Sequence, residues 1–536
     1  MADELGAILM QRFSSLTTQR QVWDDHWQDI ADYVVPRKAD ITKNRTAGDK
    51  RTELIFDSTA IHAAELMSAS LHGMLTNAST RWFSLRFRNR DLDQNDIAKE
   101  WLESVEDDMY LAFARSNFQE QIHELYHDLI CFGTGTMFIE SDPGSQIRFS
   151  TKHCAEVYLS EDENGRVDTI FRKFNMPARA VIQRFGEENL DSKILNKAKK
   201  DPYQNISLIH AIYPREERSS GRTDNRNMPF ASVYLDPESR TVLSESGFEE
   251  FPYVAPRFLK ASFEIGYGRS PAMTALPDIK MLNKMCEGTI RAAQKQVDPP
   301  LMVPDDGFML PIRTVPGGLN FYRSGTRDRL EPLNIGANNP LGLNMEEQRR
   351  QAIQSAFYVD QLIMAQGPQM TATEVVQRTE EKMRLLGPVL GRLQAELLQP
   401  LITRVYNIMV RQKLFNPAPD FMTDSDIEIE YVSPLAKAQR SGDVQSALRM
   451  IELFMPLSQI DQSAMDYIDI DGMAKYLLKV LGVPATTIRG ADQVQQMRME
   501  REEAMQAAQQ SQETMQMMEA AGAAAPAYRA LEASEQ

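Results

Sequence analysis

Two histidines and a glutamate stand at the spacing of a zinc protease motif. His123, Glu124 and His127 form the pattern H-E-x-x-H within a stretch that is predicted to be helical. On a helix, residues at i and i+4 share one face, so the two imidazoles could bind Zn²⁺ while Glu124 acts as general base. Zinc protease chemistry also requires a third ligand.

The surrounding residues do not identify that ligand. The motif is followed by Asp128, Leu129, Ile130 and Cys131, with no His-x-x-Gly continuation, although Glu140 and Glu156 are available. A motif this short also arises by chance. We therefore keep a zinc metalloprotease as an alternative hypothesis and favour a histidine pair on a surface or interface helix.

A second group of residues could contact a polyanion. Lys280, Lys284, Arg291 and Lys295 fall within an arc of roughly 60° if this stretch is helical, at about 100° per residue. The other side is mostly apolar: Ile279, Leu282, Met285, Cys286, Thr289, Ile290, Ala293 and Val297. On one chain, a basic stripe of this kind is ordinarily a solvated face. If many copies of the helix line a ring, each position becomes a ring of positive charge.

Other chemistries leave no signature in the chain. There is no G-x-x-x-x-G-K-[ST] phosphate loop, and the glycines between Gly266 and Ser270 indicate a turn that enters a helix. No local pattern supports a Ser/His/Asp triad. Cys131, Cys154 and Cys286 are odd in number and far apart, which predicts buried thiols and no disulfide framework or cysteine zinc site. We expect no cofactor and no enzymatic activity.

The composition is that of a soluble protein with several subdomains. Of the 536 residues, 42% are hydrophobic and 25% are charged. The net charge of −16 disfavours an ordinary nucleic-acid binder, but an acidic body with a local basic stripe could meet DNA without holding it. The sequence shows no signal peptide and no apolar stretch of about 18 residues, so we expect a cytoplasm-like location and no membrane contact.

The basic stripe belongs to a helix with clear boundaries. A glycine turn precedes Pro271 and Pro277, and about twenty residues then run without a helix breaker to Pro299 and Pro300. A Pro- and Gly-rich interval follows and predicts a small β-containing lobe. Asn344 should begin a second helix, with Glu347 placed for a capping box. Two helices therefore flank one lobe.

The remaining chain predicts a mainly α protein of the α+β class. The N-terminal quarter should hold helices, and antiparallel strands should fill Gly133 to Leu259, with hairpins at Asn164–Gly165 and Pro237–Arg240. The expected N-terminal helices are 3–35, 53–77 and 94–131, with a strand at 82–87. A long helix from Thr371 to Leu414 should be kinked by Gly387–Pro388 and by Pro400. We expect a strand at 427–432, short helices at 436–481 and a weak heptad pattern in the tail.

Several segments spread along the chain resemble, in the same order, segments of the head-to-tail connecting (portal) proteins of short-tailed, T7-like bacteriophages. The resemblance covers residues from about 20 to 480. Its segments are WDDHWQDIADYVVPR, RWFSL, PYVAPRF (252–258), EIGYGRSPAMTALPDIKMLN (264–283), GPQMTATEVVQR (367–378) and the helix into LLQPLITRVYNIM. Together they are far more specific than any one of them.

The resemblance implies a ring of twelve subunits around a DNA channel at one capsid vertex. Its parts would be a wing (1–262), stem helix 1 (263–300), a clip (301–341), stem helix 2 (342–365), a channel loop (366–372), a long kinked wing helix and strand (373–432), a helical crown (433–490) and a C-terminal tail (491–536). The channel loop would consist of Gln366, Gly367, Pro368, Gln369, Met370 and Thr371. Relatives can carry a basic residue in this loop, where this chain has Gln369 and Met370.

The implied function is passage of the phage genome during packaging, retention and ejection. The expected partners are further copies of the chain, double-stranded DNA held transiently and without sequence preference, the major capsid protein and scaffold, terminase, and tail adaptor or ejection proteins. The expected location is the portal vertex of the virion, after assembly in the host cytoplasm. Lys280, Lys284, Arg291 and Lys295 would face the channel. A scaffold of another capsid is the remaining alternative.

Overall fold

The computed structural model describes residues 2–43, 45–46, 48–87, 95–218, 224–302, 321, 331–332, 340–362, 386–419, 427–430, 449–450, 452, 472–474 and 494–507. The chain divides into two compact units. The larger is built from residues 1–84, 108–414 and 431–435, and the smaller from residues 85–107, 415–430 and 436–536.

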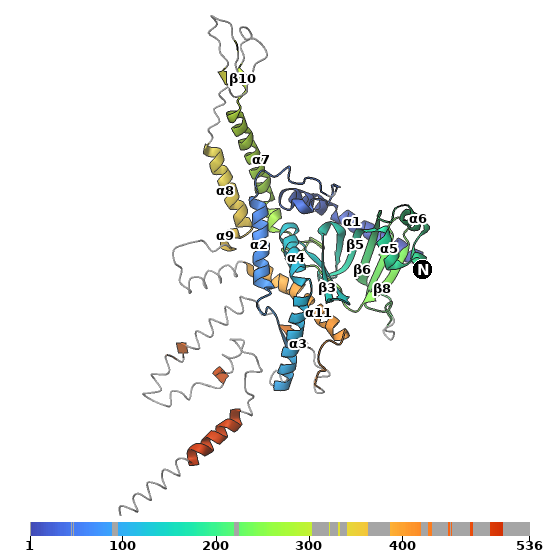
Figure 1. The fold of residues 1–536 in the computed structure, drawn as a ribbon, viewed down its shortest axis with the longest axis vertical. Coiled ribbons are helices and arrows are strands. Elements are labelled where there is room, and N and C mark those ends of the chain that lie inside the picture. Colours follow the sequence, from blue (N-terminus) through green and yellow to red (C-terminus); the bar gives the residue numbers. More distant parts are fainter. Residues whose placement is uncertain are drawn as a thin grey trace, which may run out of the picture. The chain divides into compact units, whose positions relative to one another are not determined.

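Helices predominate in the described residues, as the sequence predicts for a mixed, mainly α fold (Figure 1). Their bounds are α1 (Ala2–Tyr33), α2 (Thr59–Leu75), α3 (Asp96–Arg115), α4 (Phe118–Phe132), α5 (Ala178–Phe185), α6 (Ser192–Lys200), α7 (Pro271–Val297), α8 (Pro340–Ala356), α9 (Val359–Leu362) and α11 (Gln399–Arg411). Within the described residues, no helix has both the length and the apolar character needed to cross a membrane.

The β region between α4 and α7 is antiparallel, as expected. One sheet has the order β4-β5-β6-β7-β8 and a second has the order β3-β2-β9. Their strands are β2 (Thr136–Asp142), β3 (Gln146–Lys152), β4 (Val157–Glu161), β5 (Val167–Pro177), β6 (Asn205–Pro214), β7 (Phe230–Leu235), β8 (Val242–Phe248) and β9 (Tyr253–Val254). Both predicted hairpins are confirmed, because Asn164 and Gly165 join β4 to β5 and residues 236–241 join β7 to β8.

Further strands pair in twos. β1 (Ser84–Phe87) lies beside β12 (Ile427–Glu430), close to the strands expected at 82–87 and 427–432. β10 (Leu301–Met302) pairs antiparallel with β11 (Glu331–Pro332) just beyond the end of α7 (Figure 1). The small lobe therefore contains β structure, as predicted, while most of residues 303–339 lie outside the described residues.

Helix α1 packs along the five-stranded sheet and shares a core with it. Leu9 and Phe13 are buried against Phe171 and neighbouring strand residues. The ring of Phe13 meets that of Tyr158 edge to face, with centroids 4.7 Å apart. Aromatic pairs in this geometry stabilise a core beyond the area they bury.

Arg20 fixes the middle of α1 to the start of β4. Its side chain is buried, and its guanidinium donates to the carbonyl oxygens of Cys154 at 3.0 Å, Ala155 at 3.0 Å and Val157 at 2.8 Å. The same group lies 3.6 Å from the centroid of the Tyr158 ring. A buried arginine with these partners satisfies three carbonyl groups that would otherwise be desolvated and unpaired.

Replacing Arg20 by alanine should lower the free energy of unfolding by about 3 kcal/mol, because each buried acceptor left unpaired costs about 1–3 kcal/mol. Denaturant unfolding of the full chain measures this. Arg12→Ala is the matched control on the same helix, since the Arg12 side chain is 47% exposed and its pair with Glu216 is 3.7 Å long. Equal effects of the two substitutions would contradict the anchoring role of Arg20.

The prediction of a single helix over residues 94–131 is wrong. The chain leaves helical geometry at Ser116 and Asn117, between α3 and α4. The side-chain amide of Asn117 donates to the carbonyl oxygen of Phe149 at 2.8 Å, and its oxygen accepts from the amide of Phe149 at 3.0 Å. Asn117 therefore pairs with β3 as a further strand residue would, a long-range contact that helical periodicity cannot predict.

Two more boundaries differ from the expected ones. Helix α2 starts at Thr59 and not at residue 53, because the amides of Phe56 and Asp57 donate to the side-chain oxygen of Asn283 in α7. Helix α8 starts at Pro340, so Asn344 is not its N-cap and the predicted capping box is absent. Proline has no amide hydrogen to satisfy and is well suited to a first helical position.

The pair α5–α6, inserted between β5 and β6, was not predicted from the sequence. Both helices pack on the five-stranded sheet and share with β6 and β8 a small core made of Ala178, Val181, Phe185, Leu190, Ile194, Ala198, Ile206, Leu208 and Leu243. Each helix has only eight or nine residues. Helices this short are stable through packing rather than through propensity, so their sequence signal is weak.

A π-helical segment interrupts the long helix near its centre. Residues 386–393 are α-helical, Gln394–Leu398 are π-helical and α11 follows. Leu397 and Leu398 of this segment are both buried, and the buried side continues through Leu401 and Ile402 in α11. Pro400 stands at the start of α11, where its missing amide hydrogen requires no partner in the preceding turn. The kink predicted at Gly387–Pro388 stays a prediction.

Candidate functional site: the basic face of α7

Helix α7 is attached firmly at its first turn. The Ser270 side-chain oxygen accepts from the amide of Met273 at 3.0 Å and donates to the carbonyl oxygen of Cys131 at 2.8 Å. The amide of Gly268 donates to the Thr134 side chain at 2.9 Å. The glycine turn before α7 therefore lies directly on the end of α4, and it fixes where the helix begins. Pro277, placed before the helix by the sequence, lies inside it.

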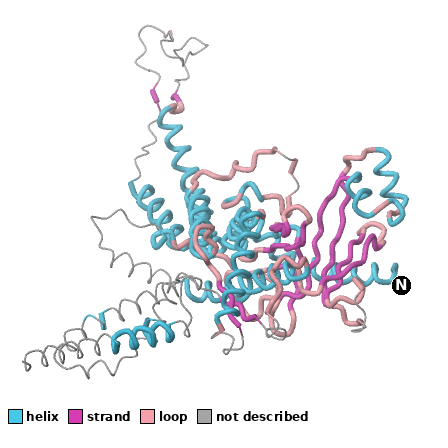
Figure 2. The backbone as a smooth tube through the Cα atoms, turned by 60° about the horizontal axis from the view of Figure 1, so that its bottom comes forward, coloured by secondary structure: helices cyan, strands magenta, loops and turns pink. Residues whose placement is uncertain are grey.

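The predicted apolar side of α7 is buried only along the first half of the helix. Ile279, Leu282 and Cys286 are buried, whereas Ile290 is 43% exposed and Val297 is 86% exposed. The second half of the helix lies beside α8 (Figures 1 and 2). Apolar side chains with this exposure favour a further packing partner for the outer half of α7.

Polar contacts join α7 to α8 and to the loop before α2. The Thr289 hydroxyl donates to Glu346 at 2.6 Å, and Arg349 pairs with Asp278 at 2.7 Å. Arg350 of α8 pairs with Asp57 at 2.9 Å. Burial opposes ionisation of Asp57, but hydrogen bonds from Thr59 and Arg350 outweigh it and hold the pKa of the carboxyl below its ordinary value. One ion pair and one hydrogen bond thus join the two helices, and Arg350 joins α8 to the loop before α2.

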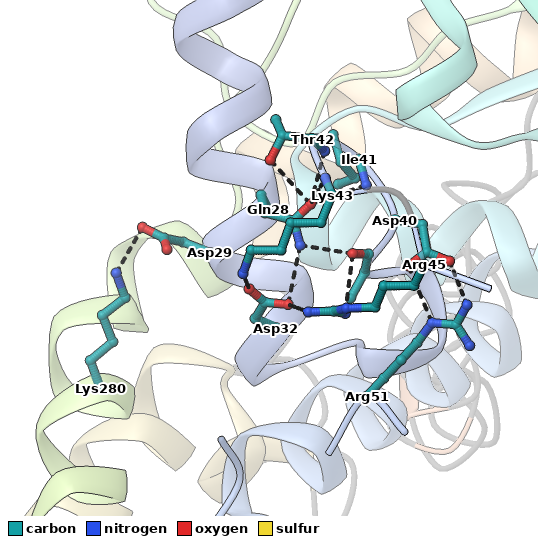
Figure 3. A network of polar contacts seen from close by, with 11 residues as sticks. Gln28, Asp29, Asp32, Asp40, Ile41, Thr42, Lys43, Arg45, Arg51 and Lys280 are labelled. Atoms are coloured by element: carbon teal, nitrogen blue, oxygen red, sulfur yellow. Dashed lines mark hydrogen bonds and ion pairs between the residues drawn. The ribbon is translucent and has the colours of Figure 1, made fainter. Parts of the chain in front are cut away.

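The four cations of the basic stripe lie on α7, and three of them have acidic partners. Lys280 pairs with Asp29 of α1 at 2.7 Å (Figure 3). Lys284 lies 2.8 Å and Arg291 2.6 Å from Glu287, which stands between them on the same helix. The hydrogen bond from Lys284 and the charge of Arg291 lower the pKa of Glu287.

Lys295 completes the stripe near the end of α7. It is exposed and makes no ion pair with any described residue. Counting Asp29 and Glu287 against the four cations leaves two positive charges on this face. The stripe is therefore only weakly positive, and its charge lies in the outer half of the helix.

The loop that follows α1 is fixed by side chains of α1 that were not predicted from the sequence. Gln28 and Asp32, both buried, project from α1 into this loop (Figure 3). The Gln28 oxygen accepts from the amides of Ile41 and Thr42, at 3.1 and 2.9 Å. Asp32 pairs with Lys43 and Arg45. Gln28 and Asp32 stand at i and i+4 in the sequence, which places them on one face of a helix.

The H-E-x-x-H residues lie on α4, as predicted, but they are used in the fold. Glu124 pairs with Arg37 at 3.0 Å and with Lys38. Burial opposes ionisation of Glu124, yet the hydrogen bond and charge of Lys38, with those of Arg37, lower its pKa to about 2. His127 is buried, and its ring nitrogen faces the Cys131 sulfur at 3.9 Å.

The described residues contain no group of three or more histidine, cysteine or acidic side chains placed to hold a metal. Glu156, named as a possible third ligand, pairs with Arg172 at 2.8 Å. All three cysteines are free and buried, as expected. The described residues therefore supply no zinc ligand set for a metalloprotease.

Buried histidines make the protein sensitive to acid. Burial lowers the pKa of His127 to about 4 and that of His210 to about 3. Because the unfolded state takes up these protons near pH 6.5 and the folded state does not, stability falls as pH decreases below 6.5, by up to about 1.4 kcal/mol per pH unit for each histidine.

His210→Gln should reduce the dependence of unfolding free energy on pH between 4 and 6.5. His62→Gln is the matched control, because His62 is exposed and its pair with Glu65 is 3.9 Å long. Denaturant unfolding at half-unit pH steps measures both slopes. A wild-type free energy of unfolding that does not change over this range would contradict the prediction.

Comparisons with known proteins cover most of the chain. The model of the family described as bacteriophage head to tail connecting protein matches residues 7–488. A protein named "Probable portal protein" of Bordetella phage BPP-1 is 33% identical, with 92% of this chain and 90% of that protein covered. The "Portal protein" of Salmonella phage epsilon15 is 31% identical, with 93% and 92% covered.

A solved structure titled "Neck of empty GTA particle computed with C6 symmetry" matches at 12% identity and a TM-score of 0.35, with 74% of this chain and 90% of that chain covered. The channel loop, Gln366 to Thr371, and most of the crown lie outside the described residues. The chain belongs to the bacteriophage head-to-tail connecting protein family.

Proposed function

We propose that this chain is the portal subunit of a tailed phage. Copies of it form a closed ring at one vertex of the capsid, and double-stranded DNA passes through the ring during packaging and ejection. The family match over residues 7–488 is the observation that carries this proposal, because it includes nearly every element of the chain. The role is structural, with no catalytic chemistry of its own.

The basic face of α7 is proposed to line the channel. In this position Lys284, Arg291 and Lys295 present a ring of modest positive charge, since Glu287 partly neutralises the first two. A strongly basic channel would bind DNA through release of many counterions and would retain it. A weakly basic ring within an acidic protein lets the duplex slide.

The remaining parts are assigned by the family resemblance. We propose a twelve-fold ring, with residues 1–262 and the long helix as wing, α7 and α8 as stem, residues 301–341 as the clip that meets terminase and then the tail adaptor, and 433–490 as the crown. The capsid and scaffold proteins would contact the wing. The virion vertex is the proposed location, after assembly in the host cytoplasm.

The mass of the purified particle tests the ring. Mass photometry should find a species close to twelve times the 60.9 kDa of one chain. A chain that stays monomeric at micromolar concentration, with and without scaffold, would refute the proposed function. The species observed also decides the copy number.

Charge reversal tests the channel face. Lys284→Glu combined with Lys295→Glu should preserve the ring and lower the yield of DNA-filled particles at least tenfold. Lys193→Glu combined with Lys199→Glu, two exposed lysines on α6, is the matched control. Normal packaging by the α7 double variant, or a ring structure with these side chains away from the axis, would refute the assignment.

A further inference from the structure

A polar hollow of about 470 Å³ lies between the β4–β5 hairpin and the long helix. The hairpin contributes Asn164 and Gly165, the segment after β9 contributes Arg257 and Lys260, and the helix contributes Arg392 and Glu396. Three cations thus line the hollow against one carboxylate. Such a lining favours an acidic group as its occupant.

Two of these cations already have acidic partners. Arg257 is buried and donates to both oxygens of Glu396, at 3.0 and 2.9 Å, to Glu161 and to the carbonyl oxygen of Gly165 at 2.9 Å. Lys260 donates to the other oxygen of Glu161 at 2.6 Å. These contacts hold the hairpin, the segment after β9 and the long helix as one rigid wall.

The Arg392 side chain donates no hydrogen bond to any described residue. Its side chain is 33% exposed, and its ion pair with Glu396 is 3.7 Å long, beyond hydrogen-bond distance. Glu396 itself is engaged by Arg257. A planar guanidinium that faces a polar hollow in this way is well placed to bind a carboxylate with two parallel hydrogen bonds.

The backbone around the hollow is also specialised. Gly165 has φ +74°, and a Cβ atom there would lie 3.1 Å from the Lys260 nitrogen. Glu396 lies in the π-helical segment Gln394–Leu398. Single π-helical turns inside α-helices are frequent at functional sites.

An apolar loop adjoins the hollow through Lys260. Three of its side chains are unusually exposed for their type: Leu259 at 47%, Phe263 at 80% and Ile265 at 63%. The loop is nevertheless ordered by backbone hydrogen bonds between Leu259 and Arg269, at 3.1 and 2.7 Å. The buried Glu264 pairs with Arg269 at 2.6 Å. A rigid loop that presents apolar side chains to water loses little entropy when a partner covers them.

We propose that the hollow and the apolar loop form one docking surface for a neighbouring copy of this chain, with a carboxylate of that copy bound by Arg392 and apolar side chains covering Phe263 and Ile265. The inference rests on the ring of the proposed function. A head-to-tail ring contact joins two different surfaces of one chain, so a surface of this kind needs no symmetry of its own. Apolar side chains beside a cation favour a protein partner over DNA, which is bound mainly through cations.

Photocrosslinking at residue 263 tests the contact in the full assembled chain. Benzoylphenylalanine replaces Phe263, and rings are assembled from an equal mixture of ¹⁴N and ¹⁵N chains. Crosslinked peptides should join light to heavy chains, which proves an intermolecular contact. The same label at Tyr203, an aromatic residue with 70% exposure on the wing, is the control. Crosslinks from residue 263 only within one chain would overturn the proposal.

Assembly of variants tests the energetic role. Arg392→Glu and Phe263→Ser should each raise the protein concentration for half-assembly at least tenfold, while Tyr203→Ser leaves it unchanged. Arg392→Gln serves where the glutamate variant does not fold. If the wild type forms a ring and these variants assemble normally, the proposed docking surface is wrong but the ring stands. If the wild type itself stays monomeric, the proposed ring is wrong. Weaker binding of a short DNA duplex with unchanged assembly would assign the surface to nucleic acid and overturn the proposal.

Discussion

Replacing Arg257 by alanine should lower the free energy of unfolding by about 3–5 kcal/mol, the usual cost of removing one partner from a buried charge network. The arginine side chain is 3% exposed, and that of Glu161 is 7% exposed. Without the guanidinium, Glu161 keeps Lys260 and the amide of Gly266 as partners among the described residues, and Glu396 keeps the backbone amide of residue 257 and the distant Arg392. The β4–β5 hairpin and the π-helical segment would then lose the contact that joins them.

Denaturant unfolding of the full chain measures this loss. Arg411→Ala is the matched control, because Arg411 also contacts two glutamates, Glu249 and Glu250, but its side chain is 37% exposed. Exposed ion pairs contribute about 0–1 kcal/mol, so this variant should unfold close to the wild type. An Arg257→Ala protein as stable as Arg411→Ala would show that the network contributes nothing beyond surface charge.

Substitution of Gly133 by alanine is expected to destabilise the protein by about 2–5 kcal/mol. Gly133 ends α4 with φ +80°, and an added Cβ would lie 2.2 Å from the carbonyl oxygen of Gly268. The left-handed conformation alone costs about 1–2 kcal/mol for an L-residue, and overpacking adds about 1–3 kcal/mol. Since Gly268 belongs to the turn that precedes α7, the clash would displace the start of that helix.

Gly48→Ala separates the two contributions. Gly48 has φ +91° but nothing within 4 Å of an added Cβ, so its substitution should cost only the conformational part. Unfolding free energies of the two variants give the packing cost by difference. A smaller loss for Gly133→Ala than for Gly48→Ala would contradict the close approach of Gly133 and Gly268.

The elements that the sequence predicted well are those with strong local signals. Helix α1 ends within two residues of its expected end, and the hairpins at Gly165 and at Arg240 lie where the turn residues place them. The family resemblance, carried by segments spread along the chain, is confirmed by the match over residues 7–488. Local patterns fix such features because turn and periodicity preferences act over a few residues.

The elements that were predicted wrongly depend on contacts far apart in the chain. Asn117 ends a helix because its side chain hydrogen-bonds to β3. Residues 53–58 form a loop because the amides of Phe56 and Asp57 donate to Asn283, more than two hundred positions away. No local preference distinguishes these asparagines from exposed ones. The same holds for Glu124, which a motif offers as a general base and which Lys38 and Arg37 hold as a structural ion.

The sequence by itself determined the family, the mainly α composition with an antiparallel β region, and a helix of about twenty residues before Pro299 with a basic stripe. Only the tertiary structure decided what the stripe amounts to. It places Asp29 of α1 against Lys280, leaves Glu287 between Lys284 and Arg291, and exposes the apolar side of the outer half of α7. Periodicity places side chains on one face of a helix, but the charge and burial of that face depend on which distant segments pack beside it.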